Sequence, residues 1–264
     1  LLGGTAGRTT LNGEGLQHED GHSHIQASLI PNCISYDPTF AYELAVIVQD
    51  GLKRMYVDQE DIYYYVTLMN ENYMHPAMPV GAEEGILKGM YLLREGEDAR
   101  SRVQLMGSGT ILREVMAASE LLYHDFNVAA DIWSVTSFNQ LRREGMEAAR
   151  WSMLHPAEPV RRSYVTCQLA ARTGPVIAAT DYLRLYADQI REYVPGQYIV
   201  LGTDGFGRSD SRQKLRQFFE VDRYYVAVAA LCALAREGTI AVHCVTDAIK
   251  RYGINPDKLP SWRV

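Results

Sequence analysis

The feature that most constrains the fold is a regular alternation of short strand-like runs with longer helical patterns over the second part of the chain. Apolar and β-branched runs are each followed by ten or more residues whose apolar side chains recur on one helical face. Strands that alternate with helices of this length require right-handed crossovers, which build a mostly parallel sheet covered by helices on both faces. The predicted fold class is therefore α/β.

The expected elements follow from these patterns. In the first part of the chain we expect strands at residues 30–38 and 62–69 and helices at residues 44–55 and 81–94. In the second part we expect strands at residues 103–106, 131–138, 175–180 and 198–203, and helices at residues 111–124, 139–153, 181–193, 215–219, 224–236 and 242–252. Asp181 is predicted to cap the helix that follows it. The opening run LLGGTAGRTTLNGEG shows neither the periodicity of a helix nor that of a strand. Pro76 and Pro79 predict a loop between the second strand and the second helix.

A charged stretch, REGEDARSR at residues 94–102, separates the two parts. Domain boundaries fall in polar segments of this kind. The predicted units are residues 1–95 and 96–264.

Composition and charge disfavour several classes of partner. The 264 residues carry 26 Lys and Arg against 32 Asp and Glu, a net charge of -6, so neither nucleic acid nor an anionic membrane surface is an expected partner. No apolar run approaches the ~20 residues of a membrane helix, and the opening residues lack a signal-peptide profile, so we expect a cytoplasmic protein. The four cysteines form no CxxC pair, and we expect them to be reduced and mostly buried.

The densest polar cluster is GLQHEDGHSH, which contains His18, Glu19, Asp20, His22 and His24. Histidine titrates near neutrality, so such a loop can move protons or donate hydrogen bonds to a developing oxyanion. A polar surface loop whose carboxylates cap backbone amides fits the same residues. A metal site is a third alternative, because the last two histidines would point the same way on an extended segment. No second cluster of ligands supports it.

Two glycine-rich turns follow predicted strands, GSGT at residues 107–110 and GTDGFGRSD at residues 202–210. Neither has the spacing of a dinucleotide-binding or P-loop motif, so we interpret both as tight strand-to-helix turns. Arg208 in the second turn could still meet a carboxylate or a phosphate. The tyrosines at residues 63–65 are predicted to lie in a half-buried strand, without a functional role.

Several long strings carry a resemblance to a known family. LLGGTAGRTTLNGEGLQHEDGHSH, PNCISYDPTFAYELAVI, YYYVTLMNENY, WSMLHP and LGTDGFGRSDSR resemble successive segments of homodimeric pyruvate dehydrogenase decarboxylating subunits, which belong to the transketolase-like thiamine enzymes. The resemblance extends over essentially the whole chain. EDGHSH stands where the family has an EDGPTH-like motif. Glu19, Asp20, Gly21 and His24 match that motif, whereas His22 and Ser23 depart from it.

The resemblance implies an architecture and an activity. Residues 1–95 would be the latter half of a pyrimidine-binding domain, and residues 96–264 a transketolase C-terminal-like domain. The implied reaction is decarboxylation of pyruvate with thiamine diphosphate and Mg²⁺, followed by reductive acetylation of a lipoyl group, with His24 and His22 as catalytic residues. The implied partners are a second copy of the subunit and the dihydrolipoyl acetyltransferase core with its lipoyl domain.

The resemblance also implies that the cofactor site is incomplete here. The family holds magnesium and diphosphate with a Gly-Asp-Gly motif, but the Asp-Gly pairs of this chain follow Glu19, Gln49 and Thr203. We therefore expect the main cofactor and metal residues upstream of Leu1, no metal ligands in this chain, and no activity of the chain alone. Two alternatives stay open: a non-catalytic dimerisation and assembly module of the same complex, and a transketolase-like enzyme acting on another 2-oxo acid or a ketose.

Overall fold

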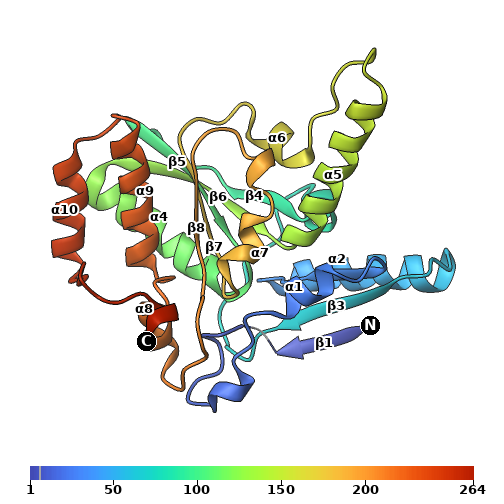
Figure 1. Cartoon of the computed structure of the whole chain (residues 1–264), viewed down its shortest axis with the longest axis horizontal. Coiled ribbons are helices and arrows are strands. Elements are labelled where there is room, and N and C mark those ends of the chain that lie inside the picture. The colour runs from blue at the N-terminus through green and yellow to red at the C-terminus, as the bar shows by residue number, and fades with distance from the viewer. Residues whose placement is uncertain (6) are drawn as a thin grey trace.

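The computed structural model describes residues 1–5 and 7–264, and it contains two sheets (Figure 1). The first sheet has the strand order β1-β3-β2 and is parallel, with β1 at Leu2–Thr5, β2 at Cys33–Tyr36 and β3 at Tyr63–Leu68. The second has the order β4-β6-β5-β7-β8, with strands at Met90–Arg94 (β4), Ser101–Gly107 (β5), Val128–Val135 (β6), Val176–Ala179 (β7) and Tyr198–Leu201 (β8). β4 pairs antiparallel with β6, and the other pairs are parallel. The predicted α/β class is confirmed.

Helices cover both faces of the second sheet. The α-helices lie at Ser23–Ser28 (α1), Ala41–Leu52 (α2), Glu83–Lys88 (α3), Leu112–Phe126 (α4), Phe138–Leu154 (α5), Tyr164–Leu169 (α6), Arg184–Asp188 (α7), Arg212–Phe218 (α8), Arg223–Arg236 (α9) and Val242–Arg251 (α10). A π-helical turn at Lys53–Val57 continues α2. The helices α4 and α9 lie on one side of the second sheet, and α5, α6 and α7 lie on the other (Figure 1).

Side chains alternate between two cores along the strands of the second sheet. Val103 and Leu105 point into the core that α4 and α9 cover, whereas Met106 points into the core beneath α5, α6 and α7. This alternation is what a strand buried on both faces requires. A third apolar cluster, which includes Ile47 of α2 and Tyr64 of β3, lies between the first sheet and the helices α2 and α3.

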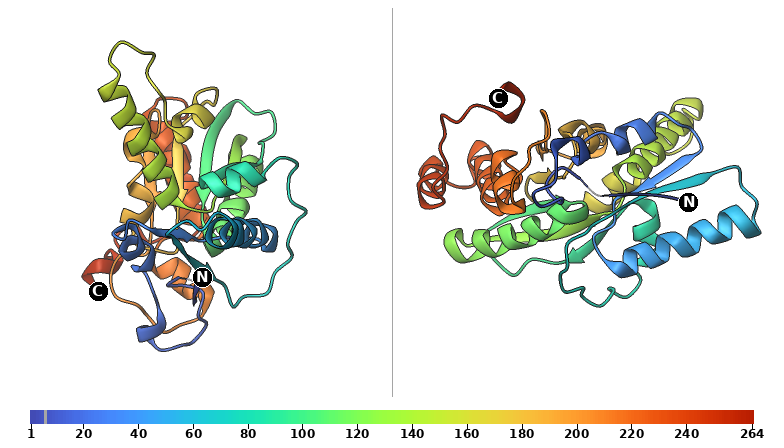
Figure 2. Two further views of the ribbon diagram at one scale, coloured as in Figure 1. Left: turned by 90° about the vertical axis from the view of Figure 1, so that its right-hand side faces the viewer. Right: turned by 90° about the horizontal axis from the view of Figure 1, so that it is seen from below.

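Main-chain hydrogen bonds join the two sheets. Asp37 N, just after β2, donates to Thr136 O at 2.7 Å, and Gly109 N donates to Asp37 O at 3.1 Å. Within the second sheet, Thr136 N, just after β6, also donates to Gly89 O, just before β4, at 2.8 Å. The first sheet with α2, and the pair α9 and α10, lie at opposite ends of the molecule in the right-hand view of Figure 2.

Most predicted elements are found within a few residues of their expected positions, but the helix expected at residues 81–94 is wrong. α3 ends at Lys88 because Gly89 has φ 110, a left-handed conformation that terminates helices, and the chain continues as β4. The strand expected at residues 131–138 begins and ends three residues earlier. Ser137 starts α5 instead, since its hydroxyl accepts a hydrogen bond from Gln140 N.

The predicted helix at residues 181–193 is also wrong. α7 covers Arg184–Asp188 and begins after Leu183, and the carboxylate of Asp181 does not cap it. That carboxylate bonds the hydroxyls of Thr9 and Thr10, which no local sequence pattern reveals.

Three short elements, β1, α1 and α6, are not in the sequence-based prediction. The division at residue 95 stays a prediction. β4, which ends at Arg94, already belongs to the second sheet.

The structure bears on two further predictions, the burial of the cysteines and the lack of a membrane-spanning helix. The four cysteines are free, but only Cys33 is buried and Cys167 is exposed, so the prediction that most are buried is wrong. Among the described residues, no helix is both long enough and apolar enough to cross a membrane.

Candidate functional site

The histidine-rich loop is shaped by Asp20. Its Oδ1 accepts hydrogen bonds from His22 N at 2.8 Å and from Ser23 N at 3.0 Å, so the carboxylate anchors the start of α1. The chain is therefore helical from Ser23 onward rather than extended, and the expectation that the two histidines point the same way is wrong. His22 is exposed, whereas His24 is fully buried.

Three tyrosine rings enclose the imidazole of His24. Tyr186 stacks against it with ring centroids 4.8 Å apart, and Tyr182 and Tyr65 meet it edge-on at 4.6 and 5.5 Å. We call Tyr65, Tyr182 and Tyr186 the tyrosine cage. Tyr65 comes from β3 of the first sheet, and the other two follow β7 of the second, so both sheets position the ring. On sequence grounds Tyr65 has no expected functional role, and the other two tyrosines are expected in the helix at residues 181–193.

A chain of hydrogen bonds leads from His24 to a buried carboxyl group. Nε2 of His24 lies 3.0 Å from Oγ1 of Thr67, and the Thr67 hydroxyl donates to Oδ1 of Asp37 at 2.7 Å. Burial lowers the pKa of His24 to about 3, so its imidazole is neutral near pH 7. Burial also raises the pKa of Asp37 to about 7, and the hydroxyls of Thr67 and Ser108 oppose this rise.

The second glycine-rich turn packs against the histidine loop. Arg208 N donates to Oε2 of Glu19 at 2.9 Å, so Arg208 meets a carboxylate through its backbone, while its guanidinium lies 5.0 Å from the centre of the Phe218 ring. Burial raises the pKa of Glu19 to about 7. The buried Arg8 guanidinium donates to Gly205 O, and its burial lowers the pKa of Arg8. The structure thus brings together two motifs nearly 190 residues apart.

Asp181 holds the opening segment against the second sheet. Its carboxylate accepts hydrogen bonds from Thr9 Oγ1 at 2.7 Å and Thr10 Oγ1 at 2.9 Å. Asp37 follows β2 and Asp181 follows β7, so both lie where parallel strands end. Such carboxyl ends are the usual place for binding sites in α/β folds.

Comparisons with known proteins agree with this geometry. Residues 1–76 match the family model of the pyruvate dehydrogenase E1 component middle domain, and residues 89–222 match that of the transketolase-like TK C-terminal domain. The chain belongs to the transketolase-like family, among the pyruvate dehydrogenase E1 components.

Similar E1 components come from several bacteria. The pyruvate dehydrogenase E1 component of Pseudomonas aeruginosa is 64% identical over 260 residues, and that of Escherichia coli K12 is 58% identical over 261 residues. The alignments cover 98% of this chain but 30% and 29% of those relatives, so the chain spans about 30% of their length.

Solved transketolase structures share the fold of this E1-family chain. Transketolase from Leishmania mexicana matches with a TM-score of 0.59 and 17% identity, over 88% of this chain and 30% of that one. Transketolase from Campylobacter jejuni matches with a TM-score of 0.61 and 15% identity, over 87% of this chain and 30% of that one. At this identity the likeness concerns the fold alone.

For a metal ion, the relevant side chains of the described residues are those of His, Cys, Asp and Glu. Within residues 1–5 and 7–264, no three His, Cys, Asp or Glu side chains are gathered to hold a metal ion. The metal alternative for the histidine loop assumed that His22 and His24 point the same way, whereas His22 is exposed and His24 is buried.

The other four histidines, His75, His124, His155 and His243, are exposed and lie outside the His24 site. Nδ1 of His75 accepts a hydrogen bond from Ala41 N at 3.0 Å. His155 directly follows α5 and stacks on Trp151, with centroids 4.4 Å apart. His124 lies in the last turn of α4, and His243 in the first turn of α10.

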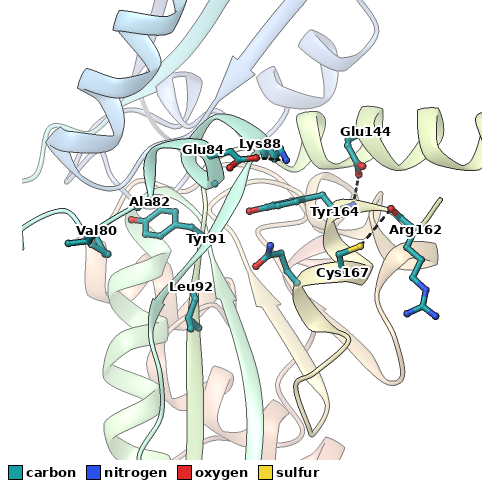
Figure 3. Close-up of a pocket in the computed structure, with 14 residues that line it drawn as sticks. Val80, Ala82, Glu84, Lys88, Tyr91, Leu92, Glu144, Arg162, Tyr164 and Cys167 are labelled. Carbon is teal, nitrogen blue, oxygen red and sulfur yellow. Dashed lines mark hydrogen bonds and ion pairs between the residues drawn. The ribbon is translucent and has the colours of Figure 1, made fainter.

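A separate surface cleft of about 620 Å³ lies between the α3–β4 segment and α6 (Figure 3). Three of its charged side chains, those of Glu84, Lys88 and Glu144, already have partners in the cleft wall. Lys88 Nζ lies 2.7 Å from Glu84 and 5.0 Å from the centre of the Tyr164 ring, and Glu144 accepts a hydrogen bond from Tyr164 N at 2.7 Å. None of the predicted site residues lines this cleft.

Proposed function

We propose that this chain is part of a thiamine-diphosphate-dependent pyruvate dehydrogenase subunit. The subunit decarboxylates pyruvate and passes the two-carbon unit to a lipoyl group by reductive acetylation. The observation that carries this proposal is identity of 58–64% to curated E1 components over 98% of the chain. The cofactor supplies the bond-breaking chemistry, and the residues of this chain orient groups and control protons.

His24 is the proposed catalytic residue within this chain. It is neutral near pH 7, fixed by the tyrosine cage, and its Nδ1 has no hydrogen-bond partner among the described residues. A buried polar atom without a partner is uncommon in folded proteins and points to a missing neighbour. In the full subunit, that neighbour would be the substrate-derived oxygen or a water. The exposed His22 is proposed to meet another segment of the subunit.

The main cofactor site is proposed to lie upstream of Leu1, since the chain has no Gly-Asp-Gly motif. Thiamine diphosphate with Mg²⁺ should therefore bind the chain alone poorly. Titration of both into the purified chain, followed by near-ultraviolet circular dichroism, tests this. Saturable binding at micromolar concentration would show that the site is largely present.

The remaining proposals concern assembly. The full subunit is proposed to act in the cytoplasm as a homodimer that delivers acetyl groups to a dihydrolipoyl acetyltransferase core. The alternative of a non-catalytic assembly module describes the same chain without a chemical role for His24. The alternative of a transketolase-like enzyme changes the substrate to another 2-oxo acid or a ketose.

A chimera tests the function directly. This chain would replace the matching 260 residues of the Pseudomonas aeruginosa E1 component, to which it is 64% identical. We expect cofactor-dependent oxidation of pyruvate, measured with an artificial electron acceptor, at a higher kcat/KM than with a branched 2-oxo acid or xylulose 5-phosphate. Preference for the ketose would refute the proposal. A folded, dimeric but inactive chimera would favour the assembly role.

The role of His24 needs a matched pair of variants in that chimera. We expect His24→Ala to lower kcat at least about 100-fold, the usual effect of losing a proton-transfer group. His22→Ala changes a neighbouring but exposed imidazole, and it should have a much smaller effect if His24 is the acting residue. Unchanged pyruvate oxidation by His24→Ala would remove its proposed role.

A further inference from the structure

The hydrogen bonds beyond His24 have a fixed direction. When Asp37 is ionised its carboxylate can only accept, so the Thr67 hydroxyl donates its single proton to Oδ1 at 2.7 Å. The Thr67 oxygen is then free only to accept. It lies 3.0 Å from His24 Nε2, so that nitrogen must carry the hydrogen.

The other ring nitrogen follows from the charge of the imidazole. Burial lowers the pKa of His24 to about 3, so the ring carries one hydrogen near neutral pH. That hydrogen is on Nε2, and Nδ1 therefore presents a lone pair. Nδ1 of His24 and Oδ2 of Asp37 are both buried, and neither has a partner in the described part of the chain.

The backbone holds Asp37 in a single place. Asp37 N donates to Thr136 O and Asp37 O accepts from Gly109 N, so both main-chain groups bond the loops that follow strands of the second sheet. Gly109 has φ +48, and a Cβ atom there would lie 2.4 Å from Oδ2 of Asp37. Only glycine leaves room for the carboxyl group against this turn.

The backbone and the side chain of His24 are also held in place. Nδ2 of Asn139 donates to His24 O at 2.7 Å, and the Tyr186 ring stacks on the imidazole. The imidazole therefore has little freedom to rotate and offer its nitrogens to other partners. A tautomer set by neighbouring hydrogen bonds is the usual way in which a protein decides which nitrogen of a histidine reacts.

We propose that Asp37, acting through Thr67, is a positioning residue that fixes His24 as the Nε2–H tautomer and leaves Nδ1 as a hydrogen-bond acceptor. The effect of this tautomer on catalysis rests on the proposed function, but the assignment of the tautomer does not depend on it. In the reaction, Nδ1 accepts a hydrogen bond from a hydroxyl of a substrate-derived group or from a water, and it does not donate to an oxyanion. Thr67 lies in β3, 43 residues from His24 in sequence, and Asp37 directly follows β2, 30 residues from Thr67.

Nuclear magnetic resonance of the 264-residue chain, labelled with ¹⁵N at its seven histidines, tests the tautomer. Long-range ¹H–¹⁵N correlations distinguish a protonated from an unprotonated ring nitrogen, and His24→Gln assigns the signal of His24. We expect one neutral species with hydrogen on Nε2 from about pH 7.5 to 8.5, where the Asp37 carboxyl is ionised. An Nδ1–H tautomer, or a charged ring in this range, would overturn the proposal without any need for a further variant.

Two matched substitutions test the positioning. Thr67→Val removes the hydroxyl at nearly constant shape, and we expect the His24 signal to become a mixture of tautomers. Thr67→Ser keeps the hydroxyl and should keep the Nε2–H tautomer. A Thr67→Val chain whose His24 stays entirely in the Nε2–H form would refute the role of the hydrogen-bond chain.

Kinetics of the chimera separate this proposal from the proposed function. Thr67→Val should lower kcat at least about tenfold with little change in KM, and Thr67→Ser should restore most of it. An inactive parent chimera would contradict the proposed function and leave the resonance result to decide the tautomer. An active Thr67→Val chimera with unchanged kcat would refute the catalytic consequence of the fixed tautomer.

Discussion

Replacement of Asp37 by Asn should change how the stability of the chain depends on pH. The pKa of this buried carboxyl group is raised from its ordinary value of 3.8 to about 7, mainly by burial. A difference of about three pKa units corresponds to about 4 kcal/mol between the two ends of the titration. Asn keeps an oxygen that can accept from Thr67, but it cannot ionise.

The sign follows from which state binds the proton more tightly. Between pH 3.8 and 7 the folded chain holds the Asp37 proton and the unfolded chain does not, so this group stabilises the fold most at low pH. Its contribution is lost as the pH rises through the folded pKa. From pH 5 to pH 8, the free energy of unfolding of the wild type should fall by about 2.5 kcal/mol relative to Asp37→Asn.

Urea unfolding at several pH values, followed by tryptophan fluorescence and far-ultraviolet circular dichroism, measures this difference. Glu19, whose pKa is also raised to about 7, is present in both proteins, so its contribution cancels to first order. Two stability profiles that stay parallel within about 0.5 kcal/mol from pH 5 to 8 would refute the reasoning, because they would show that Asp37 is ionised in the folded chain throughout.

Two further predictions concern stability. Gly174→Ala would place a Cβ atom 1.8 Å from Arg102 O at φ +87, and we expect a loss of at least about 3 kcal/mol in urea unfolding. Gly238→Ala is the control, because it has φ +73 but no atom within 4 Å, and it should cost about 1 kcal/mol; equal losses would contradict the steric argument. Glu114→Gln removes the carboxylate that lies 2.9 Å from Arg223 and 3.5 Å from the buried Arg216, and it should cost about 3 kcal/mol. A loss below about 1 kcal/mol would show that Glu71, 2.8 Å from Arg216, is a sufficient partner for that arginine.

The sequence predicted the four parallel strands of the second sheet, β5 to β8, to within a few residues, because their signals are local and repeated. The apolar run of β5 and the long periodic helix α4 each carry enough residues to decide their own conformation. The error at residues 81–94 arose where a single left-handed residue, Gly89, divides one apolar segment into α3 and β4. Periodicity over so few residues does not distinguish a short helix from a strand.

The candidate site was predictable only in part. Residue types alone drew attention to the histidine loop, but the cap provided by Asp20 decides that His22 faces outward and His24 inward. Thr67 and Asp37 carry no distinctive motif, and their place beside His24 depends on parallel pairing of β2 with β3. Tertiary contacts of this kind leave no local pattern in a single sequence.

The main-chain bonds between the two sheets have a mechanical consequence. A hinge or sliding motion between the sheets would have to break the bonds of Asp37 to Thr136 and Gly109, and these groups lie where water cannot replace the lost partners. We therefore expect the two sheets to move as one rigid body and to unfold in a single transition. Any opening that admits a substrate to His24 must then come from displaced loops or from neighbouring polypeptide, not from the sheets swinging apart.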